Sequence, residues 1–105
     1  MTVATADHRL DEIPAAEVVV DAVGMFCPIP IVRTADRVRS LSRGAILELR
    51  ADDRVALIDL PNWCRAWGHR YLGWVADGGE LRLFVEVGPG RNPRRQAGRG
   101  GVDGT

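Results

Sequence analysis

The sequence predicts a two-layer α/β sandwich of the α+β type, with element order βαβαββ, a mixed four-stranded sheet and two helices on one face. Three observations lead to this prediction. Helical and strand-like periodicities alternate along residues 17–88. A strand–helix–strand connection implies parallel pairing with a right-handed crossover. Two helices are too few to cover both faces of four strands. The alternating patterns of the second and fourth strands agree with a sheet that has one face exposed to solvent.

The length and composition indicate a single domain with two extensions. The chain has 105 residues, which is enough for one modest hydrophobic core. Residues 1–16 lack sustained periodicity, so we expect a flexible N-terminal arm. From Gly88 onward the chain contains six Gly and two Pro, a composition that cannot bury enough surface to fold. We therefore place the domain at residues 17–88 and a disordered tail at residues 89–105.

The first half of the domain contains a strand, a helix and a second strand. Residues 17–22 include three consecutive valines and end near Gly24, which is typical of a strand. Residues 28–42 have apolar side chains at helical spacing, and Gly44 is expected to stop this helix. Residues 45–51 alternate between apolar and polar side chains, which predicts a half-buried strand.

The second half contains a helix and a hairpin. Asp52 and Asp53 can cap the helix that follows, but Pro61 interrupts the helical pattern. We expect a short turn at residues 54–58 and a helix that starts near Leu60, with Asp59 as its N-cap. Two further strands at residues 71–76 and 81–87 are joined by a tight turn at residues 77–80.

The strongest local signal is a cysteine at the junction between the first strand and the first helix. The residues are Gly24 and the run Cys27-Pro28-Ile29-Pro30. We expect Cys27 to be the N-cap, where the helix dipole would lower the pKa of its thiol below the free value of about 8.5. Pro28 and Pro30 have no amide hydrogen, which leaves Ile29 as the main backbone donor for the sulfur.

The chain resembles the TusA/SirA-like sulfur carriers over about residues 17–88. The hallmark of that family is a Cys-Pro-x-Pro motif after the first strand, preceded by Gly. Further segments of this chain also look like family features at family spacing: Asp52-Asp53, the run from Asp59 to Cys64, and Gly68-His69. The resemblance implies a compact fold that accepts sulfane sulfur, holds it as a persulfide on Cys27 and passes it on.

The resemblance also implies protein partners and a transfer that needs no cofactor. The expected donor is a cysteine desulfurase or a rhodanese-type protein, and the acceptor is another protein, for example one in tRNA thiolation or sulfur metabolism. Transfer is thiol exchange, so no metal or organic cofactor is required. The chain would act as a shuttle rather than a turnover enzyme, and we expect a free monomer. The alternative is a small binding or regulatory module that uses the sheet face or the Arg-rich tail.

The remaining candidate residues are interpreted as structural. Cys64 lies in an apolar helical run, so we expect a packed, inert thiol. Its spacing with Cys27, His8 and His69 matches no usual zinc pattern. His69 can cap the end of a helix, and Trp63 and Trp67 favour core packing. Met25 and Phe26 fit docking and packing equally well, whereas the polar face of the first helix is interpreted as solvated: Arg33, Arg37 and Arg39.

Charge and hydropathy limit the cellular location and the partners that we expect. All fourteen basic residues are Arg, so lysine-based chemistry is excluded. The last eighteen residues carry four Arg against one Asp, whereas residues 1–87 are acidic overall, which makes direct nucleic-acid binding by the domain unlikely. No apolar run approaches the roughly 20 residues of a membrane span, and no secretory signal is visible. We therefore expect a cytoplasmic protein.

Overall fold

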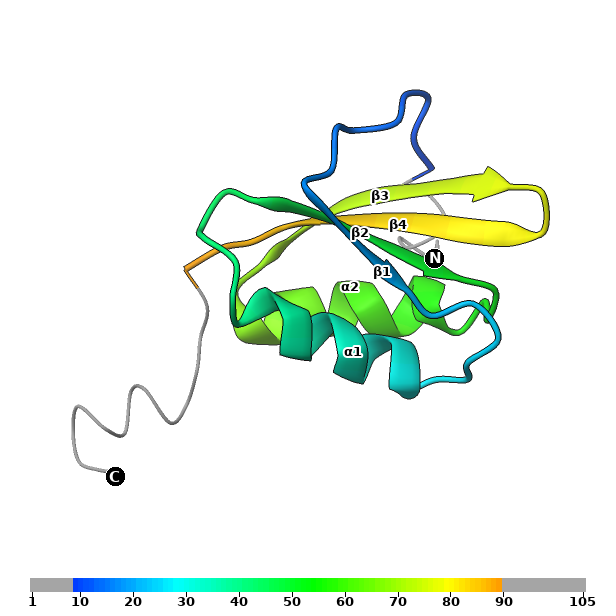
Figure 1. Cartoon of the computed structure of the whole chain (residues 1–105), viewed down its shortest axis with the longest axis horizontal. Coiled ribbons are helices and arrows are strands. Elements are labelled where there is room, and N and C mark those ends of the chain that lie inside the picture. The colour runs from blue at the N-terminus through cyan, green and yellow to red at the C-terminus, as the bar shows by residue number, and fades with distance from the viewer. Residues whose placement is uncertain (1–8, 90–105) are drawn as a thin grey trace, which may run out of the picture.

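A computed structural model describes residues 9–89, and it confirms the predicted architecture. The elements are β1 (Val18–Asp21), α1 (Ile29–Val38), β2 (Ile46–Ala51), α2 (Ala56–Trp67), β3 (Arg70–Asp77) and β4 (Glu80–Glu86). The sheet order is β1-β2-β4-β3, with β1 and β2 parallel and the other neighbours antiparallel. Both helices lie on the same face of the sheet (Figure 1).

The hydrophobic core lies between the sheet and the two helices. The side chains that alternate on β2 and β4 point into it, as the period of two predicts. Its fully buried members include Leu47, Leu49, Leu60, Leu83 and Val85. No helix in residues 9–89 is long and apolar enough to cross a membrane.

The first helix is shorter than the predicted range of 28–42. It ends at Val38, and the chain then turns so that the amide of Ser40 donates to the carbonyl of Arg37. Gly44 is not the helix stop. It has a φ of +94° in the loop before β2, and its amide donates to the carbonyl of Val87 at 2.7 Å. Glycine suits this position because an L side chain disfavours positive φ.

The second helix starts earlier than predicted, at Ala56, and continues through Pro61. Asp59 is therefore in its first turn and is not the N-cap. A proline inside a helix removes one backbone hydrogen bond. Ala56, Leu57 and Leu60 are buried in the core, and we attribute the survival of the helix to this burial, which offsets the lost bond.

The face of the sheet away from the helices is not fully exposed to solvent, contrary to the prediction. Phe84 and Glu48 point to this face, yet they are 0% and 4% exposed. The segment before β1 lies on the same side of the sheet (Figure 1). It meets β3 where Arg9 forms a bridge with Trp74. Of the predicted arm and tail, residues 1–8 and 90–105 lie outside the described residues.

Candidate functional site: a thiol held by an acidic pair

The Cys27 loop and the acidic pair after β2 lie at the same end of the sheet. Since β1 and β2 are parallel, the C-terminal ends of both strands lie there. The loop of residues 22–28 follows β1, and Asp52 and Asp53 follow β2. Residues that are about 26 positions apart in sequence therefore become neighbours, and the carboxylates face the loop that carries the thiol.

The two carboxylates fix the loop through its backbone amides. Gly24 donates its N–H to Asp52 Oδ1 at 3.0 Å, and Cys27 donates its N–H to Asp53 Oδ2 at 2.9 Å. The second oxygen of Asp53 accepts the N–H of Val55 at 3.0 Å, just before α2 begins. Hydrogen bonds to a charged acceptor are stronger than neutral ones, so this pair determines where the cysteine sits.

The predicted capping role of Cys27 is wrong. The N-cap of α1 is Pro28, with Ile29 and Pro30 as the first two helical residues, and no side chain caps the helix. The Ile29 amide donates to the carbonyl of Phe26 at 2.9 Å, so it is not the expected donor to the sulfur. The Cys27–Pro28 peptide bond is cis.

The predicted acidity of Cys27 is also wrong. Its thiol is half-buried, and desolvation together with the nearby Asp53 and Asp59 carboxylates raises its pKa from an ordinary value of 9.0 to about 11. A hydrogen bond with the Asp59 side chain acts in the same direction. In contrast, the amides of Cys27 and Val55 hold the pKa of Asp53 below its ordinary value. At neutral pH the site is thus a neutral thiol beside a charged carboxylate.

Apolar side chains are exposed around the thiol. Phe26, next to Cys27, is 77% exposed, whereas Met25 packs against the core. The sequence allowed docking or packing for both residues. The structure now distinguishes them, because Phe26 is exposed and Met25 packs inward. We call the exposed apolar side chains at this end of the sheet the apolar rim: Val23, Phe26, Ile29, Val55 and Ile58. Such a rim beside a reactive group is typical of a surface on which a partner protein docks.

The other cysteine and the histidine take structural places. Cys64 is 1% exposed, and burial raises the pKa of its thiol to about 12, as expected for an inert packed cysteine. His69 does not cap carbonyls. Its Nδ1 accepts the amide of Gly88 at 3.0 Å, and its ring stacks on Trp63 with centroids 4.8 Å apart. Burial lowers the pKa of His69, which agrees with a neutral ring that accepts a hydrogen bond.

Two further expectations concern the helix surfaces and metals. The arginines of the first helix are exposed as predicted: Arg33, Arg37 and Arg39. Trp63 packs against the core, but Trp67 is partly exposed at the end of α2. Within residues 9–89, no three His, Cys, Asp or Glu side chains are grouped so that they could hold a metal ion.

The acidic residues at this site have a role that their capping pattern does not predict. Asp52 and Asp53, predicted as helix caps, accept the amides of Gly24 and Cys27 in the cysteine loop. Asp59, predicted as an N-cap, is a neighbour of the thiol. A signal was present, because an acidic pair directly after a strand that is parallel to β1 must lie near the loop that follows β1.

Comparison with known proteins gives a consistent result. The family described as "Sulfurtransferase TusA" matches residues 18–87. A putative sulfur carrier protein of Bacillus subtilis, YrkF, is 44% identical over 73 residues, which are 70% of this chain and 40% of that protein. A second one, YrkI, is 40% identical over 70 residues, which are 67% of this chain and 93% of that protein.

More distant relatives agree. The sulfur carrier protein TusA of Pseudomonas savastanoi pv. phaseolicola is 32% identical over 73 residues, which are 70% of this chain and 87% of that protein. Among solved structures, a SirA-like protein from Desulfitobacterium hafniense superposes with a TM-score of 0.55 at 23% identity, and the match covers 68% of this chain and 97% of that one. This last likeness supports the two-layer fold.

Proposed function

The chain belongs to the TusA family of sulfur carrier proteins, and on this basis we propose that Cys27 carries the sulfur as a persulfide. The observation that carries the proposal is the position of this thiol. Of the two cysteines, only Cys27 is accessible, and it lies on a loop that Asp52 and Asp53 fix beside the apolar rim. Membership of this family favours the carrier over the binding module that the sequence left open.

The transfer is an exchange between two cysteines. The Cys27 thiolate attacks the outer sulfur of a persulfide on the donor protein. A new S–S bond forms at Cys27, the donor's S–S bond breaks, and the donor cysteine leaves as a thiolate. Delivery repeats the step with an acceptor thiolate, and Cys27 is then the leaving group. The sulfane sulfur moves without net oxidation, so no external oxidant or reductant is needed.

The raised pKa of Cys27 favours retention of the sulfur between partners. A thiol with a high pKa is mostly protonated at neutral pH and reacts slowly with stray electrophiles. It is also a poor leaving group, so a persulfide on Cys27 loses its outer sulfur slowly. We propose that docking of a partner changes the surroundings of Asp53 and Asp59 and so allows the thiol to ionise and leave.

The proposed partners are proteins. A cysteine desulfurase or a rhodanese-type protein would supply the sulfur, and a second protein would receive it through the same surface. Both need access to Cys27, so both would contact the apolar rim. We place this exchange in the cytoplasm, where thiols stay reduced.

Loading with sulfur tests the assignment. Incubation with a cysteine desulfurase and cysteine should add about 32 Da, the mass of one sulfur atom, to the intact protein. Cys27→Ser should abolish the adduct, and Cys64→Ser should leave it unchanged because that thiol is buried. Intact-mass and peptide mass spectrometry measure both. Sulfur bound to Cys64 in the wild type would overturn the assignment.

Phe26 should matter for protein donors and not for small ones. Phe26→Ala removes an exposed aromatic side chain from the apolar rim. We expect transfer from a desulfurase to slow by roughly tenfold, the effect of losing one interface hot spot, while loading from inorganic polysulfide stays unchanged. The matched control is Ile13→Ala, an exposed apolar residue in the segment before β1. Equal slowing in both variants, or slowing with polysulfide, would contradict a docking role.

A further inference from the structure

The loop that carries Cys27 has almost no backbone N–H left to offer a substrate. The start of a helix is usually a place where free amides bind an anion. Here five amides of residues 23–30 already donate to oxygen atoms of the domain: Val23, Gly24, Met25, Cys27 and Ile29. Pro28 and Pro30 have no amide hydrogen. In this range, the described residues leave only the Phe26 amide without an acceptor, so an oxyanion beside the sulfur would find almost no backbone donors.

The negative charge around the sulfur is not offset by a cation. Asp53 accepts the amide of Cys27 itself at 2.9 Å, and the thiol hydrogen-bonds to the Asp59 side chain. Residues 51–59 contain three Asp and one Arg, the exposed Arg54. Within the described part of the chain, none of these four side chains takes part in an ion pair. The carboxylates beside the thiol therefore keep their charge unpaired.

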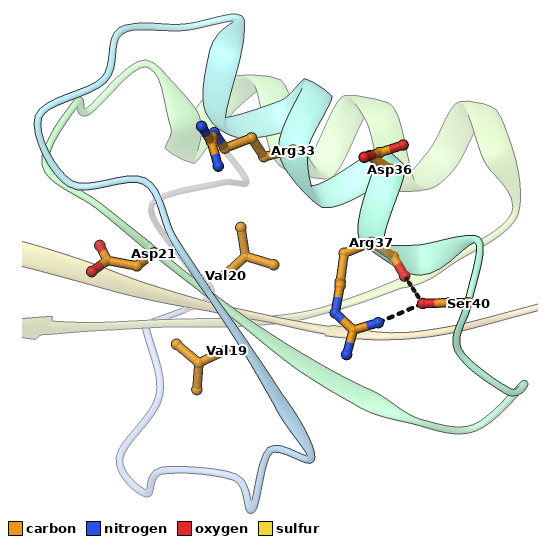
Figure 2. A pocket seen from close by; sticks show the side chains of 7 residues that line it. All are labelled: Val19, Val20, Asp21, Arg33, Asp36, Arg37 and Ser40. Atoms are coloured by element: carbon orange, nitrogen blue, oxygen red, sulfur yellow. Dashed lines mark hydrogen bonds between the residues drawn. The ribbon is translucent and has the colours of Figure 1, made fainter.

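The first arginine of α1 does not supply the missing positive charge. Arg33 lines a groove of about 470 Å³ between β1 and α1 (Figure 2). Two arginines and two acids line this groove: Arg33, Arg37, Asp21 and Asp36. Its charges are therefore balanced within the groove, and Arg33 has acidic groups close to it there. The end of the sheet that carries Cys27 stays negative.

We propose that Asp53 and Asp59 determine the specificity of the transfer by selecting against anionic sulfur donors such as thiosulfate, an inference that rests on the proposed function. A negatively charged donor that approaches Cys27 meets two carboxylates and almost no free backbone amides. Like charges a few ångströms apart repel each other even in water. The favoured donor has its sulfane sulfur on a neutral or positively charged group, which a protein provides when a basic side chain lies next to its own cysteine.

The charge of the leaving group makes this selection effective. With thiosulfate as the donor, the Cys27 thiolate would attack the outer sulfur, the S–S bond of thiosulfate would break, and sulfite would leave with the electron pair. The transition state of this attack carries the charge of the thiolate and both charges of thiosulfate, beside Asp53 and Asp59. With a protein persulfide the leaving group is a single thiolate, and a cation of the donor protein can stabilise it.

A pair of thiol reagents with opposite charges tests the proposal on the full-length Cys64→Ser chain. The cationic probe is trimethylammonioethyl methanethiosulfonate, and the anionic probe is sulfonatoethyl methanethiosulfonate. The thiolate attacks both at sulfur, methanesulfinate leaves, and a mixed disulfide forms, so the ratio of the two rates cancels the thiolate population. We expect the cationic-to-anionic ratio of the native protein at low salt to exceed that of the urea-unfolded chain by roughly tenfold, and to fall as salt screens the carboxylates.

Single substitutions assign the charge preference to the carboxylates. Asp59→Asn should reduce the native ratio by roughly threefold, because it removes one of the two charges beside the sulfur. The matched control, Asp11→Asn, changes an exposed acid in the segment before β1 and should keep the original ratio.

Three results would each overturn the proposal: a native ratio at or below the unfolded one, an unchanged ratio in Asp59→Asn, or loading of Cys27 from thiosulfate as fast as from a desulfurase. Loading of Cys27 by a cysteine desulfurase is measured in parallel. A high native ratio without such loading would refute the carrier role and leave the charge selection at this thiol intact.

Discussion

Alkylation of Cys27 should have a midpoint near pH 11, far above that of a free cysteine, because burial and two carboxylates disfavour the thiolate. A shift of about two pKa units corresponds to a thiolate population roughly 100-fold smaller at neutral pH. The measurement is the rate of reaction with iodoacetamide against pH in the Cys64→Ser variant, first native and then in urea. A native midpoint at or below the unfolded one would contradict this account of the site.

Substitution of the carboxylates identifies the cause of the shift. Asp59→Asn and Asp53→Asn should each lower the midpoint and speed alkylation at neutral pH, since each removes a negative charge near the sulfur. Asp59→Asn is the cleaner test, because Asp53 also holds the amides of Cys27 and Val55. Asp11→Asn, an exposed acid in the segment before β1, should leave the midpoint unchanged.

The same shift predicts a dependence of stability on pH. The pKa of Cys27 is higher in the folded state than in the unfolded one, so the protonated thiol contributes stability that is fully present below its ordinary pKa of 9.0. That contribution is lost as the pH rises through about 11. Urea unfolding at several pH values between these limits should show a decline in stability for the wild type that is reduced in Cys27→Ser. An equal decline in both would show that other groups cause it.

Glu48→Ala should be the most destabilising change of a charged residue. The Glu48 carboxylate is buried and accepts two hydrogen bonds from Arg82, at 2.7 and 3.1 Å, and it pairs with Arg50 at 3.3 Å. Removing this carboxylate takes the nearest acceptor from both arginines, which are partly exposed and keep only longer contacts, at 3.8 and 3.9 Å, to Asp77 and Glu80. We expect a cost of about 2 kcal/mol, the size of a hydrogen bond between charged groups. Urea unfolding measures the loss, and loading of Cys27 should be unaffected.

Glu86→Ala is the matched control for Glu48. Glu86 pairs with Arg70 at 3.2 Å, but the Arg70 side chain is 75% exposed and that of Glu86 34%, so solvent screens the pair and we expect a cost below about 1 kcal/mol. The double variant Glu48→Leu with Arg82→Leu should recover part of the loss, because it removes the unpaired charge along with its partner. Similar losses in Glu48→Ala and Glu86→Ala would show that burial of Glu48 has little energetic consequence.

The sequence predicted the order of the elements because that order follows from local periodicity. The alternation on β4 and the helical spacing in α1 are both confirmed. Errors arose where distant residues decide the local structure. Pro61 indicated a break, but α2 continues through it, since burial of Leu57 and Leu60 depends on the sheet above them. Likewise, Phe84 fits an exposed position of an alternating strand, yet it is fully buried.

The candidate site depends on distant residues even more strongly. The Cys-Pro-x-Pro run predicts that Cys27 is the reactive cysteine, and the structure places this residue in a partly exposed loop. Its acidity could not be read from the run itself. The helix start suggested a lower pKa, but the stronger influences are burial and carboxylates supplied by β2 and α2. Their proximity depends on the parallel pairing of β1 and β2, which follows from the strand–helix–strand order of the whole unit and not from the residues around the cysteine.

The two hydrogen bonds of Asp53 link the rigidity of the loop to the reactivity of the sulfur. One oxygen accepts the amide of Cys27, and the other accepts the amide of Val55 just before α2. The same negative charge disfavours the thiolate. A mutation that removes this charge therefore accelerates the chemistry and loosens the scaffold at once, a trade-off between activity and stability. Selection for a faster carrier would thus favour changes at Asp59 over changes at Asp53, because among the described residues no backbone amide donates to the Asp59 carboxylate.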